Sequence, residues 1–230
     1  SRNNVDSEFI NQGFVFYNDW ISKFESYVEK ILEYVITDES YISNLYAQNK
    51  NILLEGAQGS GLSINSKNYP DVTSSNPSVG CALNSTGLNH KQIDEVIGVI
   101  KSYKTKVGSG DFPSRITEGP EKILAEVGNE FGATTGRPRK CGWLDLDEVI
   151  DAVNINAVDH ICLIKTDVVT HIEEPYYYYQ KRKNKISRIK SVELVDEGFK
   201  TLLEVIKDTT GVKQISFTTG PKRGEIVWDA

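Results

Sequence analysis

The chain of 230 residues has a formal net charge of −6 and is 39% hydrophobic, which suits one soluble domain with a substantial core. The acidic balance argues against non-specific binding to nucleic acid, because no excess of basic residues is available to displace counterions. Because there is no membrane-length apolar run and no signal peptide, we expect a cytoplasmic protein without a membrane partner. The absence of methionine suggests a processed product or a piece of a longer chain.

The first third of the chain is predicted to be helical and then irregular. Apolar residues from Trp20 to Val35 recur at helical spacing and predict a long amphipathic helix over 17–36. Asp38 is placed to cap a second, shorter helix. The apolar run 51–55 predicts a buried strand. The Gly-, Ser- and Asn-rich stretch 56–88 predicts a long loop that is either functional or disordered.

Strands and helices alternate in the rest of the chain. Strands are predicted at 96–106, 160–165 and 213–217, helices at 120–127, from Asp145 onward and at 199–206, and a surface hairpin over 176–194. Gly128 is the expected C-cap of the first of these helices. The alternation predicts an α/β fold with a mostly parallel central sheet flanked by helices, and we expect residues 1–230 to form a single domain.

The stretch from Gly132 to Trp143 is a candidate anion-binding loop. Arg137 and Arg139 present planar forks of donors that match the edge of a carboxylate or a phosphate. Neighbouring threonine hydroxyls and glycine amides can complete a cradle around an anion. A solvated basic loop is the alternative that composition leaves open.

Loops of small polar residues follow the predicted strands, where ligands bind in open α/β sheets. These loops are 55–61, 165–167 and 218–220. The first has the glycine spacing of a Walker A loop but lacks its lysine, which excludes that motif. The Asp167 carboxylate can accept two N–H donors from one edge of guanine, whereas adenine offers no such pair, and the stem of Lys165 can cover a base. Surface decoration is the alternative for this pair.

Six segments stand in the order seen in adenylosuccinate synthetases, and the chain resembles roughly the C-terminal half of such an enzyme, most clearly over 51–230. The segments are Glu55–Gly59, Tyr69–Asn76, Thr105–Pro113, Asn129–Arg139, Cys141–Asp145 and Lys165–Val168. The resemblance implies purine nucleotide biosynthesis by ligation of L-aspartate to IMP, giving adenylosuccinate. It also implies GTP as the co-substrate and Mg²⁺ as the metal, with a 6-phosphoryl-IMP intermediate.

The resemblance further implies roles for individual residues. IMP would be bound by Gln58, Thr73 and Arg137. L-Aspartate would be bound by Ala133, Thr134, Thr135, Gly136, Arg137, Pro138 and Arg139. GTP would be bound by Arg139, Lys165, Thr166, Asp167, Thr218, Thr219 and Gly220. These roles agree with the chemistry of the residues, because arginine forks suit a dicarboxylate and an acid suits guanine.

The chain departs from the family pattern in several places. Residues 62–68 lack the two acids and the histidine that are usual there, Lys106 replaces an arginine and Asp111 replaces a proline. The chain looks like a divergent branch of the family, and its Gly-x-Gly-Leu-Ser run at 59–63 is similar to that of archaeal and bacteriophage relatives. A phage-type 2-aminoadenylosuccinate synthase, acting on dGMP with ATP as the possible donor, is therefore one alternative.

The family's glycine-rich Gly-Asp-Glu-Gly-Lys-Gly-Lys loop does not occur in this sequence. The catalytic residues and the Mg²⁺ ligands are therefore expected outside it, and a non-catalytic nucleotide-binding homologue is a second alternative. His160 and His171 fall in none of the family motifs and are expected to be packed or surface residues. The resemblance implies a homodimer for the complete enzyme.

Overall fold

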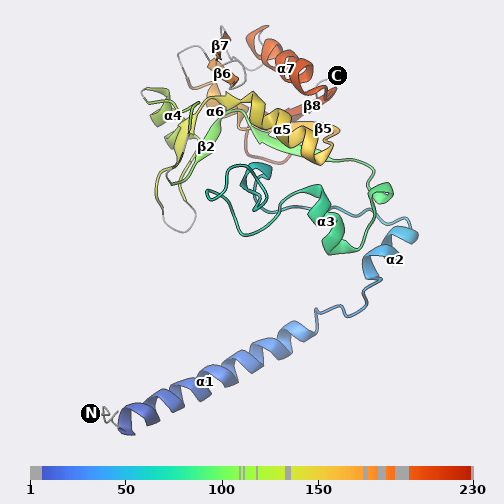
Figure 1. Cartoon of the computed structure of the whole chain (residues 1–230), viewed down its shortest axis with the longest axis vertical. Helices are drawn as coiled ribbons and strands as arrows, with labels where there is room; N and C mark the ends of the chain where they lie inside the picture. Colours follow the sequence, from blue (N-terminus) through green and yellow to red (C-terminus); the bar gives the residue numbers. More distant parts are fainter. Residues whose placement is uncertain are drawn as a thin grey trace. The chain divides into compact units, whose positions relative to one another are not determined.

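The computed structural model of the chain describes residues 7–108, 110, 112–117, 119–132, 136–172, 176–180, 185–189 and 197–228. The chain divides into two compact units, Ser1–Ile52 and Leu53–Ala230, whose elements are labelled in Figure 1. None of the described helices combines the length and the apolar sequence that crossing a membrane requires.

The first unit contains two helices in its described part, α1 at Ser7–Leu32 and α2 at Tyr41–Ala47. Helix α1 begins and ends earlier than the predicted helix over 17–36. Ser40, not Asp38, is the N-cap residue of α2, so the predicted cap is wrong. The Asp38 carboxylate instead accepts hydrogen bonds from the hydroxyl and the backbone N–H of Ser40, at 2.6 and 2.9 Å, which lower the pKa of Asp38.

A four-stranded sheet forms the centre of the second unit, with the order β1-β5-β8-β9. Its strands are β1 (Ile97–Lys101), β5 (His160–Ile164), β8 (Gln214–Thr218) and β9 (Ile226–Trp228). β1, β5 and β8 are parallel, and β9 is antiparallel to β8. The prediction of a mostly parallel sheet is therefore confirmed, and the carboxyl ends of three strands reach one edge of it.

Shorter elements surround this sheet. Strand β2 (Lys104–Lys106) pairs with β3 (Lys140–Gly142), and β4 (Leu144–Asp145) pairs with the hairpin of β6 (Tyr176–Gln180) and β7 (Lys185–Ile189). The helical segments are η1 (Ser60–Leu62), α3 (Val79–Thr86), η2 (His90–Gln92), α4 (Pro120–Val127), α5 (Leu146–Asn156), α6 (Thr166–Val169) and α7 (Glu197–Thr210). Helix α7 contacts β7, and the two are seen together in Figure 1.

Two helix boundaries follow the sequence pattern closely. Gly128 is the C-cap residue of α4, as predicted. Asp145 is the N-cap residue of α5, and its carboxylate accepts a hydrogen bond from the backbone N–H of Glu148 at 3.3 Å. The hairpin is also confirmed for β6 and β7, while residues 181–184 and 190–194 lie outside the described residues.

One strand prediction is wrong, and another is confirmed only in part because the strand is interrupted. Residues 51–55 form no strand, and Leu53 is 87% exposed, because an apolar run becomes a strand only where a neighbouring backbone can pair with it. The predicted strand 96–106 breaks after Lys101. There the N–H of Ser102 donates to the carbonyl of Ile164 at 2.9 Å, and its hydroxyl donates to the carbonyl of Lys165 at 2.9 Å. This turn separates β1 from β2.

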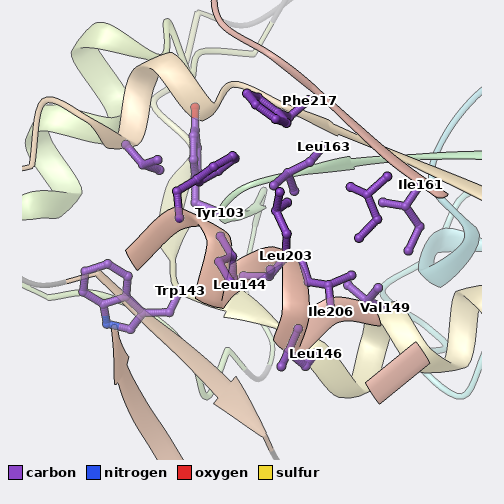
Figure 2. Packing of buried hydrophobic residues seen from close by; sticks show 14 of the residues in the cluster. Tyr103, Trp143, Leu144, Leu146, Val149, Ile161, Leu163, Leu203, Ile206 and Phe217 are labelled. Atoms are coloured by element: carbon purple, nitrogen blue, oxygen red, sulfur yellow. The ribbon is translucent and has the colours of Figure 1, made fainter. Parts of the chain in front are cut away.

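The core of the second unit lies where α5 and α7 pack together beside β5 and β8. Figure 2 shows Leu163, Leu203 and Ile206 within this cluster of buried side chains. The rings of Phe199 and Phe217 meet edge to face with their centroids 4.7 Å apart. The ring of Tyr103 is also buried in the cluster, and its hydroxyl oxygen points away from the labelled aliphatic side chains (Figure 2).

Candidate functional site

The loops that follow β5 and β8 meet at one corner, here called the strand-end corner (residues 165–167 and 218–220). The backbone N–H of Lys165 donates to the Thr218 hydroxyl at 3.2 Å, and the Thr166 hydroxyl donates to the Thr218 carbonyl. Lys165 has a φ of 59°, in the left-handed region that non-glycine residues rarely adopt. Such backbone strain is found mostly at functional sites, where the surroundings hold it in place.

Asp167 lies in the first turn of α6 within the strand-end corner and is partly exposed. Its backbone carbonyl accepts a hydrogen bond from the Thr170 hydroxyl at 2.6 Å. Within the described part of the chain, its carboxylate accepts no hydrogen bond. The N–H of Thr219 donates to the carbonyl of Glu225 at 2.9 Å, which orders the chain beside Gly220. The corner therefore combines an ordered backbone with an available carboxylate.

A buried carboxylate, Glu130, lies between the strand-end corner and Arg139, and its side chain is only 1% exposed. Both of its oxygens accept hydrogen bonds from the Nζ of Lys101 at 2.9 Å. It also accepts one from the Tyr103 hydroxyl at 2.8 Å and one from the Nη1 of Arg139 at 3.0 Å. The Nζ of Lys165 lies 3.5 Å from it. One carboxylate thus holds three basic side chains.

The end of α4 places this carboxylate inside the protein. The helix stops at its C-cap Gly128, and Asn129 adopts a left-handed φ of 50°, which reverses the chain. The following Glu130 returns its N–H to the carbonyl of Ala125 at 2.8 Å. The carbonyl of Gly128 accepts a hydrogen bond from the Nζ of Lys165. A Cβ at Gly128 would overlap the Tyr103 hydroxyl, so the close packing requires glycine.

Charge in this cluster is unevenly balanced. Burial raises the pKa of Glu130, but hydrogen bonds from Lys101 and Tyr103 outweigh burial and leave that pKa below its ordinary value. Burial and the hydrogen bond to Glu130 raise the pKa of Tyr103, so the phenol remains a neutral donor. Burial lowers the pKa of Lys101, and Glu130 offsets part of that effect. Because three basic groups face one carboxylate, the cluster favours an anionic ligand.

The arginine loop (residues 132–140) is closed at its base by backbone hydrogen bonds. The N–H of Gly132 donates to the carbonyl of Arg137, and the N–H of Gly136 donates to the carbonyl of Gly132, both at 2.8 Å. Phe131 and Pro138 form an isolated β-bridge across the same base. Gly136 has a φ of 62°, which glycine adopts without strain. These contacts fix the base of the loop.

Arg139 turns inward from this loop, whereas Arg137 is exposed. The Nη1 of Arg139 is held by Glu130, and its Nε is buried without a hydrogen-bond partner in the described residues. A buried N–H of this kind is unfavourable unless a ligand or water accepts it. The predicted aspartate contacts at Ala133, Thr134 and Thr135 lie outside the described residues.

The loop 60–76, which includes Thr73, is folded and not disordered. The N–H of Thr73 donates to the carbonyl of Leu62 at 2.8 Å, which closes the loop on itself. Asn156, at the end of α5, fastens both sides of it. Its amide donates to the Ser60 hydroxyl at 3.0 Å, and its side-chain oxygen accepts from the N–H of Val79 at 3.0 Å.

An ion pair joins the loop 60–76 to β2, the strand that pairs with β3 at the end of the arginine loop. The Nζ of Lys106 on β2 lies 3.4 Å from the Asp71 carboxylate, and Lys106 is opposite Lys140 in the β2–β3 register. The structure therefore brings the loop of Thr73 toward the arginine loop. Gln58 is exposed with a left-handed φ of 73°, and no hydrogen bond or ion pair joins it to the other candidate residues among those described.

The sequence pattern assigns no role to Glu130, although it lies inside one of the family-like segments. The available signal is an acid directly before a loop with two arginines, but its burial cannot be read from that order. His160 is packed, as expected: its Nε2 lies 2.9 Å from the Ser216 hydroxyl and its ring contacts Trp228. The described residues contain no cluster of three or more metal-ligating side chains.

A family model and curated relatives match most of the chain. The family model described as adenylosuccinate synthetase matches residues 3–175. A curated protein from Thermodesulfovibrio yellowstonii, named adenylosuccinate synthetase, is 33% identical over 236 residues, which cover 90% of this chain. The chain spans only 56% of that relative's length.

Two solved structures are similar to the chain. The fully ligated adenylosuccinate synthetase from Plasmodium falciparum matches 97% of this chain and 62% of its own, with a TM-score of 0.84 and 26% identity. The succinoaminodeoxyadenylate synthetase of cyanophage S-2L, bound to dGMP and dATP, matches 84% of this chain and 50% of its own, with a TM-score of 0.59. At 18% identity, this second likeness shows a shared fold alone.

Proposed function

Because the chain belongs to the adenylosuccinate synthetase family, we propose that it recognises the substrates of a GTP-dependent ligation of L-aspartate to IMP, which yields adenylosuccinate. The main observation that supports this proposal is that a single buried carboxylate contacts both the strand-end corner and the arginine loop. Two loops of different chemistry, one suited to a base and one to a dicarboxylate, then lie on adjacent sides of one site.

The strand-end corner is the proposed guanine site. Asp167 supports this assignment because its carboxylate accepts no hydrogen bond within the described part of the chain and can take two N–H donors from guanine. The ordered backbone supports it too, since Thr218 receives hydrogen bonds from both residues that precede Asp167. The full proposed set is Lys165, Thr166, Asp167, Thr218, Thr219 and Gly220, with Arg139 reaching the same nucleotide.

The arginine loop is the proposed L-aspartate site. Arg139 supports this assignment because its buried Nε lacks an acceptor that a substrate carboxylate can supply. The full proposed set is Ala133, Thr134, Thr135, Gly136, Arg137, Pro138 and Arg139. Gln58, Thr73 and Arg137 are the proposed IMP contacts. The ion pair between Asp71 and Lys106 supports Thr73, because it draws that loop toward the arginines.

The phosphoryl-transfer step is proposed to use residues outside this sequence. In this family Mg²⁺ would neutralise phosphate charge, and the described residues contain no cluster of three or more metal-ligating side chains. They are proposed instead to bind the base, the acceptor nucleotide and the amino-acid substrate. A homodimer in the cytoplasm is the corresponding proposal for the protein at its native length.

The experiment is a steady-state assay of adenylosuccinate formation by the protein at its native length, with Arg137→Leu as the variant. Loss of a charge-assisted contact of about 1.5–3 kcal/mol should raise the KM for L-aspartate roughly 10- to 150-fold. Lys122→Ala is the control, because Lys122 is 81% exposed on α4 and pairs with Glu126 in the same helix. An unchanged KM in Arg137→Leu would place that arginine outside the site.

Acceptor and donor specificity are tested in the same assay. IMP with GTP should support turnover, and dGMP with ATP should not, because Asp167 suits a guanine donor. Preferred turnover of dGMP would instead favour the phage-type reaction. The differences from the usual family sequence at 62–68 are the observation that supports this alternative. Calorimetric binding of GTP and IMP without any turnover would identify a nucleotide-binding homologue that does not catalyse the reaction.

A further inference from the structure

We propose that Glu130 is a positioning residue that ties the arginine loop to the strand-end corner, so that binding of the dicarboxylate and binding of the purine donor depend on each other. This inference rests on the proposed function. It assigns a role to a side chain that lies beneath both loops and that is proposed to act only through Arg139 and Lys165.

The two oxygens of Glu130 face different loops. Oε1 accepts a hydrogen bond from the Tyr103 hydroxyl and lies 3.5 Å from the Nζ of Lys165, in the strand-end corner. Oε2 accepts a hydrogen bond from the Nη1 of Arg139, in the arginine loop. The Nζ of Lys101 is 2.9 Å from both oxygens and therefore bridges them. The carboxylate plane is fixed from both ends, and a rotation that favours one loop must weaken the contact with the other.

Burial makes this arrangement sensitive to charge. Glu130 is almost fully buried, while the side chains of Lys101, Arg139 and Lys165 are each about one quarter to one third exposed. If the carboxylate became neutral, three cations would face one another without a counter-charge, and repulsion would drive the two loops apart. The charge of Glu130, more than its bulk, therefore sets the distance between the loops.

The planar guanidinium of the arginine side chain links the position of Glu130 to the ligand. The guanidinium is planar, so a hydrogen bond that fixes Nη1 also fixes the direction of the Nε–H, which has no partner among the described residues. Lys165 is held in a comparable way by Glu130 and by the carbonyl of Gly128. An anion that draws Arg139 outward changes the charge around Glu130, and this change reaches Lys165. By linkage, the effect must be reciprocal.

The test compares Glu130→Gln with a matched control in the protein at its native length. Glutamine keeps the size of the side chain and removes its charge. Asp145→Asn is the control, because Asp145 is also a buried carboxylate, 3.5 Å from the Nζ of Lys104, and lies outside both loops. In Glu130→Gln we expect the KM values for GTP and for L-aspartate to rise together, each by about tenfold, with a smaller change in kcat. Asp145→Asn should change neither.

Coupling is measured directly by the dependence of one KM on the other substrate. In the parent protein, saturating GTP should lower the KM for L-aspartate by about fivefold or more, and in Glu130→Gln this effect should disappear. Tyr103→Phe keeps the buried ring and removes one hydrogen bond to Glu130, so it provides a second variant if Glu130→Gln folds poorly. It should raise both KM values in the same direction but by less.

A readout that does not need turnover separates this inference from the proposed function. Acylation of lysines by acetic anhydride, followed by mass spectrometry, reports how firmly Lys165 is held, with exposed Lys122 as the internal reference. Glu130→Gln should raise the acylation rate of Lys165 relative to Lys122 severalfold. An unchanged ratio, or KM values that stay at the parent level, would overturn the positioning role. If the parent protein fails to ligate L-aspartate while Glu130→Gln still frees Lys165, the proposed function fails and the positioning role stands.

Discussion

The hydroxyl of Thr166 donates a hydrogen bond to the backbone carbonyl of Thr218, across the ends of the parallel strands β5 and β8. Thr166 is completely buried, so no water is available to replace this donor. The contact joins two loops that are more than fifty positions apart in the chain. It is therefore a tertiary bond and not a local cap.

Replacing Thr166 with valine should destabilise the protein. Valine has the same shape but no hydroxyl, so the carbonyl of Thr218 loses the hydrogen bond that it accepts, at a cost of about 1–3 kcal/mol. Urea denaturation measures the free energy of unfolding. Thr86→Val is the matched control, because the Thr86 hydroxyl bonds to Ala82 within α3 and joins no separate elements. An equal loss of unfolding free energy in both variants would show that the tertiary hydrogen bond contributes no more to stability than the bond within a helix.

Gly128→Ala should also destabilise the protein, by about 1–3 kcal/mol, because a Cβ there would overlap the Tyr103 hydroxyl and the carbonyl of Leu124. Thermal unfolding measures the change. Gly59→Ala is the control, since a Cβ at that position would meet nothing within 4 Å and its φ of −96° suits alanine. A normal melting temperature for Gly128→Ala would mean that the end of α4 adapts without cost.

Stability should fall in acid through Glu130. Burial raises the pKa of this carboxyl, but hydrogen bonds from Lys101 and Tyr103 hold it below the value in the unfolded chain. The unfolded chain therefore takes up the proton first, so the contribution of Glu130 is complete above the unfolded pKa and is lost as the pH falls through the folded one.

Urea denaturation from about pH 7 to about pH 3 tests this dependence against Glu130→Gln, which cannot titrate at this position. The difference in unfolding free energy between the parent and the variant should be largest near neutral pH and should shrink toward acid. A difference that stays constant over the series would show that the hydrogen bonds do not depress the pKa.

Asp167→Asn should relax the choice of purine donor in the protein at its native length. An amide cannot accept two N–H donors at once, so one contact with guanine is lost and the KM for GTP should rise about tenfold or more. Competition between GTP and ATP in the ligation assay measures the ratio in which the two donors are used. Glu126→Gln, an exposed change on α4, is the control. A variant that excludes ATP as strictly as the parent would argue against base recognition by Asp167.

Much of the fold can be predicted because its signals are local. The caps Gly128 and Asp145 follow from residue chemistry at helix ends, and β5 and β8 follow from short apolar runs. The break after Lys101 cannot be predicted in this way, because Ser102 makes its turn with the carbonyls of Ile164 and Lys165 on the neighbouring strand.

The candidate site divides in the same manner. The residue types of the arginine loop and the strand-end corner indicate anion and base recognition from sequence alone. Glu130 does not stand out, because a lone acid is usually on the surface and only the folded chain encloses it with Lys101, Arg139 and Lys165. The contact of Glu130 with both loops arises from tertiary packing, and no residue spacing in the sequence predicts it.

The amide of Asn156 has a consequence for the energetics of nucleotide capture. By contacting Ser60 and the N–H of Val79, it turns residues 60–79 into a closed ring anchored on a helix end. The entropy of closing that ring is lost when the chain folds, so it would not be lost again on binding of the phosphate proposed for Thr73. Affinity at this loop is thus set in part by a side chain on α5 that contacts the two flanks of the loop and not Thr73 itself.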